Sequence, residues 1–251
     1  MALTEHTRIN ALLQELTAQL QIILADQFLG LYIGGSLATN NFHEKTSDID
    51  CYIITASLLS ENKIVKIEQM HQQFYSRKNR YAKKFEVSYI PQQDLLNFDP
   101  NAKRPYFNEG LFYPGQYGSN YLIELHVLRE KGITIVGPDI KNLVKEISNS
   151  DLILAMRKNL HEYWEAALDD VSKFKRSDYQ VFAILTMCRT LYSLETGDIA
   201  SKAEAARWAT QQLDMQWVDI IKQALAWEPD KSIQLSEEAQ RFVKYVLLNA
   251  N

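Results

Sequence analysis

Apolar residues in the first 150 positions alternate between two spacings. Ile9, Leu12, Leu16 and Leu20 recur every three or four residues, which predicts an amphipathic helix over residues 4–25. Continuous or alternating apolar runs instead predict strands. By these two criteria we expect further helices over residues 58–78 and 121–131, and strands over residues 28–33, 48–55, 83–91 and 133–136.

Residues 92–120 fit neither spacing. This stretch carries scattered prolines and glycines with aromatic residues between them, including Tyr106, Phe112 and Tyr113. A connection of this length inside a compact domain tends to be a lid, a binding loop or disordered, and the aromatic residues argue against disorder. We therefore expect a long ordered loop, which either faces a substrate or serves as a structural cover.

After about residue 150 the pattern becomes helical only. Plausible N-caps precede five helical patterns, at Ser150-Asp151, Ser177-Asp178, Ser201, Asp214 and Ser236. Ser201 and Glu204 have the spacing of a capping box, which gives the following helix a defined start. The expected organisation is an α/β (α+β) domain with a mixed sheet at residues 1–149, followed by an all-α helical bundle domain at residues 150–251.

Composition narrows the classes of partner. The formal net charge is −4 and no run is rich in Lys and Arg, so a nucleic-acid partner is not expected and a small cationic molecule fits better. No apolar run has transmembrane length, and the amino terminus lacks a signal-peptide pattern. We expect a monomeric protein of the cytoplasm without a membrane partner, in which Cys51 and Cys188 are buried free thiols.

The chemistry is expected where the first two strands begin and end. The run from Leu31 to Ile33 ends in Gly34-Gly35-Ser36, which indicates a tight turn whose N–H groups and hydroxyl suit a phosphate. Twelve residues after Ser36, Asp48 and Asp50 open the next apolar run. Residues i and i+2 of a strand share a face, so their like charges favour a cation between them, and Mg²⁺ prefers carboxylate and phosphate oxygens.

Two further residues acquire a role only beside this motif. Glu86 lies on the strand over residues 83–91, where it is either a metal ligand and proton acceptor or an ordinary exposed glutamate. Lys202 is in the first turn of a helix, where its charge opposes the helix dipole. It either meets an anionic ligand or is a plain surface lysine.

Three segments resemble the streptomycin/spectinomycin (aminoglycoside) adenylyltransferases of the nucleotidyltransferase superfamily. The first is Gly-Gly-Ser at 34–36 with Ser-Asp-Ile-Asp at 47–50, and the second is Val-Gly-Pro-Asp at 136–139. The third spans residues 185–209, with the helix around Arg189 and the run Thr-Gly-Asp-Ile-Ala-Ser-Lys-Ala-Glu-Ala-Ala-Arg-Trp-Ala. The first segment is shared across the superfamily, whereas the third is specific to these enzymes and their relatives.

This resemblance implies an enzyme that transfers AMP from ATP to a hydroxyl of an aminoglycoside or aminocyclitol and so gives antibiotic resistance. Asp48 and Asp50 match the magnesium ligands, and Glu86 matches the catalytic base beside them. We expect two Mg²⁺ ions, with Asp48, Asp50 and Glu86 as ligands. Gly35 and Ser36 match the turn that holds the triphosphate, and Arg189 and Lys202 match cations that reach the nucleotide phosphates.

The acceptor is less well defined by the sequence. The tryptophan and aspartate that streptomycin-accepting members carry before the arginine helix have no convincing match, which favours spectinomycin over streptomycin. Glu86, Phe112 and Asp178 are the acceptor contacts that we expect, with Phe112 replacing a tryptophan of the family. The open alternatives are another small hydroxylated metabolite, a non-catalytic module of the antitoxin type, and an RNA-tailing enzyme.

Overall fold

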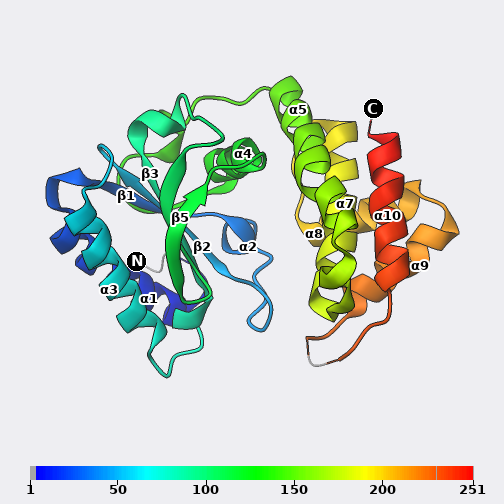
Figure 1. The fold of residues 1–251 in the computed structure, drawn as a ribbon, viewed down its shortest axis with the longest axis horizontal. Coiled ribbons are helices and arrows are strands. Elements are labelled where there is room, and N and C mark those ends of the chain that lie inside the picture. The colour runs from blue at the N-terminus through cyan, green and yellow to red at the C-terminus, as the bar shows by residue number, and fades with distance from the viewer. Residues whose placement is uncertain (1–3, 230, 251) are drawn as a thin grey trace. The chain divides into compact units, whose positions relative to one another are not determined.

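The computed structural model describes residues 4–229 and 231–250, which form two compact units, Met1–Glu146 and Ile147–Asn251 (Figure 1). Each unit has its own buried cluster of apolar side chains. The mixed sheet of the first unit and the helices of the second confirm the expected fold class.

The first unit combines a six-stranded sheet with helices. Its α-helices are α1 (Thr7–Leu24), α2 (Gly35–Ala38), α3 (Glu61–Tyr75) and α4 (Tyr121–Lys131). Its strands are β1 (Phe28–Ile33), β2 (Ile49–Thr55), β3 (Phe85–Pro91), β4 (Lys103–Asn108), β5 (Leu111–Gln116) and β6 (Ile133–Val136). Short 3₁₀ turns lie at Ala25–Gln27, Ala82–Lys84, Gln92–Leu95 and Ile140–Asn142.

The strand order is β5-β4-β3-β2-β1-β6, with β2 and β3 parallel and the other neighbours antiparallel. Side chains alternate across the sheet, and paired residues share a face. One face, called here the helix-covered face, carries Leu31, Ile33, Cys51, Ile53, Phe85, Val87, Tyr89 and Phe107 in one core with residues of α1 and α3. Figure 1 shows both helices on the same side of the sheet, opposite α4.

The opposite face, called here the carboxylate face, carries Asp50 from β2, Glu86 from β3 and Tyr106 from β4. Strand register places them there, because Asp50 pairs with Glu86 and Tyr106 pairs with Ser88. The same face also carries the buried side chains of Ile54 and Ile90 further along β2 and β3. The sheet register therefore places the half-buried carboxylates of Asp50 and Glu86 at one end of a face that is otherwise partly apolar.

Residues 103–116 correct one expectation, because they form the hairpin β4–β5 rather than a loop without secondary structure. Glu109 (φ 49°) and Gly110 (φ 83°) both have positive φ at the turn, the backbone of a type I′ hairpin. Pro105 and Pro114 pair with each other in the two strands at the sheet's end. Pro114 lies in the edge strand β5, which leaves backbone groups unpaired, and Pro105 lies outside the residues of β4 that pair with β3. The two prolines concealed the strands in the sequence.

The described part of the second unit is helical. It contains α5 (Asn149–Asn159), a π-helical segment (Leu160–Glu165), α6 (Ala166–Asp169), a 3₁₀ turn (Val171–Lys175), α7 (Ser177–Thr196), α8 (Lys202–Gln212), α9 (Met215–Ala226) and α10 (Ser236–Asn249). The capping box of Ser201 and Glu204 at the start of α8 is present as expected. The cap of α5 is Ser148 rather than Ser150, because the Ser148 hydroxyl accepts from the Asp151 N–H.

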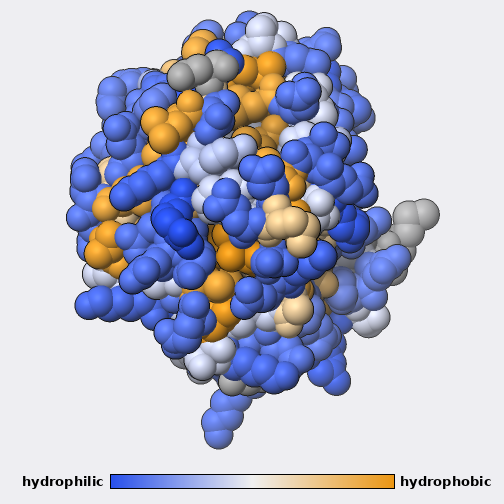
Figure 2. Space-filling view, turned by 90° about the vertical axis from the view of Figure 1, so that its right-hand side faces the viewer, coloured by the Kyte–Doolittle hydropathy of each residue, from blue (hydrophilic) through white to orange (hydrophobic). Residues whose placement is uncertain are grey.

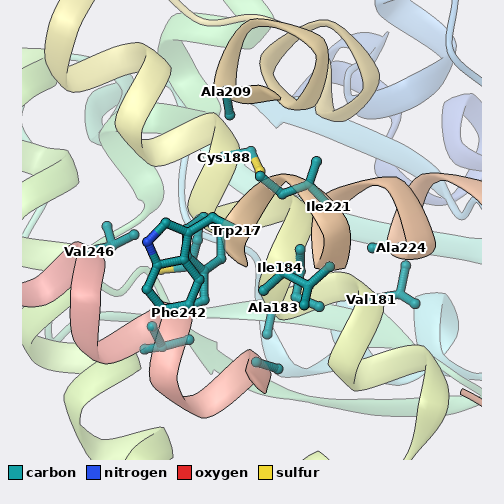
Figure 3. Packing of buried hydrophobic residues seen from close by; sticks show 14 of the residues in the cluster. Val181, Ala183, Ile184, Cys188, Ala209, Trp217, Ile221, Ala224, Phe242 and Val246 are labelled. Atoms are coloured by element: carbon teal, nitrogen blue, oxygen red, sulfur yellow. The ribbon is translucent and has the colours of Figure 1, made fainter. Parts of the chain in front are cut away.

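The core of this unit gathers around α7. Figure 3 shows Trp217 of α9 beside Phe242 and Val246 of α10, with Ile184 and Cys188 of α7 nearby. The Trp217 and Phe242 ring centroids are 5.0 Å apart. Cys51 and Cys188 are both buried and free, which confirms the expectation for the two thiols.

The face drawn in Figure 2 carries mainly hydrophilic side chains with apolar ones among them, which is ordinary for a protein surface. Within the described ranges, no helix combines the length and the apolar character needed to cross a membrane.

Candidate active site

The turn between β1 and α2 lies directly against the start of β2. The Gly34 N–H donates to the Asp50 carbonyl at 2.9 Å. Gly35 has φ 54°, and a Cβ at this position would collide with the Asp50 carboxylate. Glycine is therefore required both by the backbone conformation and by the approach of Asp50. The Ser36 side chain is half-buried on the same turn.

Asp50 and Glu86 are brought together by the parallel pairing of β2 and β3, in which they are direct partners. Both side chains are half-buried, whereas Asp48 is exposed and precedes the first residue of β2. The charges of Asp50 and Asp48 both act on Glu86. The structure thus groups the three predicted carboxylates at one end of β2 and β3, with Asp48 on the loop rather than on the strand.

Glu86 has the electrostatic signature of a crowded acidic site. Burial, with the Asp50 charge next in weight, raises the pKa of Glu86 to about 8, and a hydrogen bond from Tyr106 opposes this rise. Perturbed carboxylates of this kind are concentrated at functional sites. A cation bound beside them would lower the pKa and stabilise the ionised form.

A residue that the sequence analysis missed, Glu124 of α4, belongs to the same group. Burial raises its pKa to about 7, with Arg104 opposing and Asp50 adding to the rise. The Glu124 carboxylate accepts from Asn120 Nδ2 at 2.6 Å and lies 3.8 Å from the Arg104 guanidinium. Only the tertiary position of α4 brings Glu124 here, so no local sequence pattern could have indicated it.

The loop that carries Asp48 is fastened to the start of β3. Lys84 Nζ donates to the carbonyls of Ser47 at 2.7 Å and Lys45 at 3.3 Å. Earlier in the same loop, the Glu44 carboxylate accepts from the Tyr81 hydroxyl and from Arg80. These contacts fix the backbone immediately before Asp48.

The predicted phosphate-binding cations both lie in the second unit. Arg189 and Phe182 are seven residues apart on α7, so they share one face of that helix. Lys202 is the first residue of α8, and its Nζ lies 4.7 Å from the centroid of the Phe182 ring. Arg189 and Lys202 therefore belong to the same surface of the helical unit.

Phe112 and Asp178, two of the predicted acceptor contacts, do not lie with the carboxylates in the structure of their own units. Phe112 pairs with Phe107 on the helix-covered face, where it stacks on His71 with ring centroids 6.1 Å apart. It does not share a face with Glu86; its neighbour Tyr113, which pairs with Tyr106, does. Asp178 is exposed at the start of α7 and forms an ion pair with Arg176, which lowers its pKa.

The number and type of ligands at this site can be compared with those that Mg²⁺ requires. Across the described residues, no group of three or more His, Cys, Asp and Glu side chains is spaced to hold a metal ion by itself. Asp48 and Asp50 nevertheless supply hard oxygen ligands, and Mg²⁺ typically takes one or two carboxylates together with substrate phosphates and water. The pair fits an ion that binds with a nucleotide, whereas the expected set of three ligands is not preformed.

The mixed sheet, the Gly-Ser turn and the paired acidic residues define a nucleotidyltransferase. Residues 22–106 match the family model of the nucleotidyltransferase domain. Residues 142–249 match the model of the aminoglycoside adenylyltransferase C-terminal domain.

Known adenylyltransferases align with nearly the whole length of this chain. An aminoglycoside (3'') (9) adenylyltransferase of Klebsiella pneumoniae is 25% identical, over 95% of this chain and 94% of the relative. A spectinomycin 9-adenylyltransferase of Campylobacter jejuni is 28% identical, over 90% and 89%. Along nearly its whole length the chain is therefore similar to aminoglycoside adenylyltransferases of the nucleotidyltransferase superfamily, and it is an adenylyltransferase enzyme.

A solved structure has the same fold. The spectinomycin adenyltransferase AAD(9) from Enterococcus faecialis, determined with ATP and spectinomycin, superposes with a TM-score of 0.76. The match covers 95% of this chain and 97% of that chain at 19% identity. These relatives and this fold confirm the resemblance seen in the sequence, and the enzyme assignment replaces the non-catalytic alternative.

Proposed function

We propose that this enzyme transfers AMP from ATP to a hydroxyl of an aminocyclitol or aminoglycoside, with Mg²⁺ as cofactor and spectinomycin preferred over streptomycin. The observation that carries the proposal is the pairing of Asp50 with Glu86 beside the Gly35 turn. Relatives named as spectinomycin 9-adenylyltransferases support the choice of acceptor.

Each residue has a distinct role in the proposed reaction. Asp48 and Asp50 would hold magnesium, which supplies charge neutralisation to the phosphate oxygens when bound. Gly35 and Ser36 contact the triphosphate from the first unit. Arg189 and Lys202 of the helical unit contribute cations to the phosphates, where they stabilise negative charge in the transition state.

Glu86 accepts the proton of the acceptor hydroxyl. The hydroxyl oxygen then forms a bond to the α-phosphorus of ATP, and the bond from that phosphorus to the bridging oxygen breaks. Pyrophosphate leaves, and the acceptor becomes an AMP ester. The acidic character of the carboxylate face, to which Glu124 adds, suits an acceptor that carries protonated amines.

The test is incubation of the purified enzyme with labelled ATP and Mg²⁺, separately with spectinomycin, streptomycin, amine-free cyclitols and a short RNA. We expect label on spectinomycin, less on streptomycin, and none on RNA. Label on the RNA alone, or on an amine-free cyclitol in preference to both antibiotics, would contradict the proposal. Omission of Mg²⁺ in the presence of a chelator is expected to abolish transfer.

The proposed role of Lys202 has a separate test. Lys202→Ala is expected to raise the KM for ATP about tenfold with little change in the KM for the acceptor, because it removes a charge-assisted contact to phosphate. Lys222→Ala, on α9 of the same unit, is a control for loss of one positive charge.

A further inference from the structure

We propose that Tyr106 is a positioning residue for Glu86, which holds one carboxylate oxygen so that the other faces the acceptor hydroxyl. This inference rests on the proposed function, because it assigns Glu86 the role of proton acceptor. Nothing in the Gly-Ser or acidic motifs points to Tyr106, which lies in the stretch expected to be a loop.

Strand register brings the Tyr106 hydroxyl to Glu86. Tyr106 pairs with Ser88, two residues along β3 from Glu86, so the two side chains are neighbours on the carboxylate face. The Tyr106 hydroxyl donates a hydrogen bond to Glu86 Oε1. From the described residues, Glu86 Oε2 receives no hydrogen bond, which leaves this oxygen available for a substrate proton.

The Tyr106 ring is itself held in place. Its centroid lies 5.4 Å from that of Tyr113 in an edge-on arrangement, and 5.7 Å from the Arg104 guanidinium. Arg104 is only 5% exposed, donates to the Gln116 carbonyl at 3.2 Å, and lies 4.4 Å from the Tyr117 ring centroid. The hydroxyl that contacts Glu86 is therefore fixed by packing within the hairpin.

A fixed donor matters because a carboxylate rotates about its terminal torsion with little restriction. A hydroxyl on Oε1 selects one orientation, and a tyrosine hydroxyl remains protonated at neutral pH, so it stays a donor. Loss of orientation at a reacting group reduces the rate of the chemical step while leaving ligand binding intact. The proposal thus predicts an effect on kcat rather than on KM.

The primary variant is Tyr106→Phe, which keeps the ring and removes the hydroxyl. We expect kcat to fall about tenfold to a hundredfold, with the KM values for ATP and acceptor and the Tm nearly unchanged. Tyr113→Phe is the matched control, because the Tyr113 hydroxyl forms no hydrogen bond with any other described residue although its ring packs on Tyr106. We expect wild-type kcat from this control, and an equal loss in both variants would overturn the proposal.

A double-mutant cycle with Glu86→Gln shows whether Tyr106 acts through Glu86. If it does, adding Tyr106→Phe to Glu86→Gln causes no further loss of kcat, whereas independent roles give multiplied losses and overturn the inference. A Glu86→Gln enzyme with wild-type turnover would refute the proposed function of Glu86, and this inference with it. An impaired Glu86→Gln enzyme together with an unaffected Tyr106→Phe enzyme would refute the inference alone.

Discussion

The two faces of the sheet in the first unit share the same strands but differ in how they hold titratable groups. His71 of α3, which packs against the helix-covered face, is held neutral: burial lowers the pKa of His71 to about 3, and its ring is stacked 4.4 Å from Phe107. On the carboxylate face, burial and like charge raise the pKa of Glu86 to about 8.

The difference shows how strand alternation divides stability from reactivity. Moving one residue along β2, from Asp50 to Cys51, passes from a half-buried carboxylate to a thiol 1% exposed in the core. Because the side-chain period of a strand is two, a slip of one residue would exchange the two faces. Substitutions of the half-buried polar residues on the carboxylate face should therefore affect turnover, and those in the core of the helix-covered face should affect folding.

The largest effect is expected from Asp50→Asn. The amide keeps the shape of the side chain but removes the charge proposed to hold Mg²⁺, so transfer should fall about a thousandfold or more. Turnover of labelled ATP at saturating Mg²⁺ measures this loss. Asp26→Asn, at a residue whose side chain is 93% exposed, is the control, and comparable activity in the two variants would show that the carboxylate face has no special role.

A hundredfold loss of kcat, in order of magnitude, is expected for Gly35→Ala, because the new methyl group displaces the Asp50 carboxylate. Gly118→Ala separates this displacement from backbone strain. Gly118 also has positive φ (73°), but the nearest atom to its added Cβ is at 3.4 Å. If both alanine variants lost activity equally, strain rather than contact with Asp50 would be the cause.

A smaller change is expected for Lys84→Met, which preserves the apolar stem but removes the hydrogen bonds to the backbone before Asp48. Greater freedom of this loop should raise the KM for Mg-ATP about tenfold, because the loop must be ordered on binding. Lys83→Met alters an exposed neighbour and serves as the control. An unchanged KM for Mg-ATP in Lys84→Met would show that the hydrogen bonds of Lys84 to the loop do not contribute to nucleotide binding.

The smallest effect on activity is expected at the helix-covered face, where the measurable change is in stability. In the unfolded chain His71 titrates near pH 6.5, whereas in the fold its pKa is about 3, so between these values the unfolded state binds one more proton. The free energy of unfolding should thus fall as pH is lowered through this window, by about 1.4 kcal/mol per pH unit. The double variant His71→Phe/Tyr89→Phe, which removes both partners of their hydrogen bond, should lack this component.

Urea unfolding at pH 6.5 and pH 5 measures that difference, since titration of the other groups is common to both proteins. Equal losses of stability in the wild type and the double variant would mean that His71 is not held neutral by burial. The activity of the double variant, expressed per folded molecule, should equal that of the wild type. This result would distinguish the helix-covered face from the carboxylate face.

Much of this arrangement follows from local sequence. The apolar runs predicted β1, β2 and β3 closely, and the motif at Gly35, Asp48 and Asp50 indicated the nucleotidyltransferase superfamily from residue types and spacing alone. These features were predictable because strand alternation and the Gly-Ser turn depend on neighbouring residues. The capping box at Ser201 was predictable for the same reason.

The missed features depend on contacts between distant segments. Phe112 and Tyr113 face opposite sides of the sheet, and which one shares the face of Glu86 is fixed by the register of a hairpin whose prolines disguised it. Tyr106 and Glu124 reach the carboxylates only through the pairing of β4 with β3 and the packing of α4. In the sequence, the glycine at 110 was the available signal for the turn of this hairpin, where the structure gives both Glu109 and Gly110 a positive φ.

The most direct measurement is mass spectrometry of the acceptor after incubation of wild-type enzyme and Glu86→Gln with ATP, Mg²⁺ and spectinomycin. The account predicts the AMP ester of spectinomycin with the wild type and almost none with the variant, although both bind ATP equally. Full conversion by Glu86→Gln would contradict the central claim that the Glu86 carboxylate accepts the proton in nucleotide transfer.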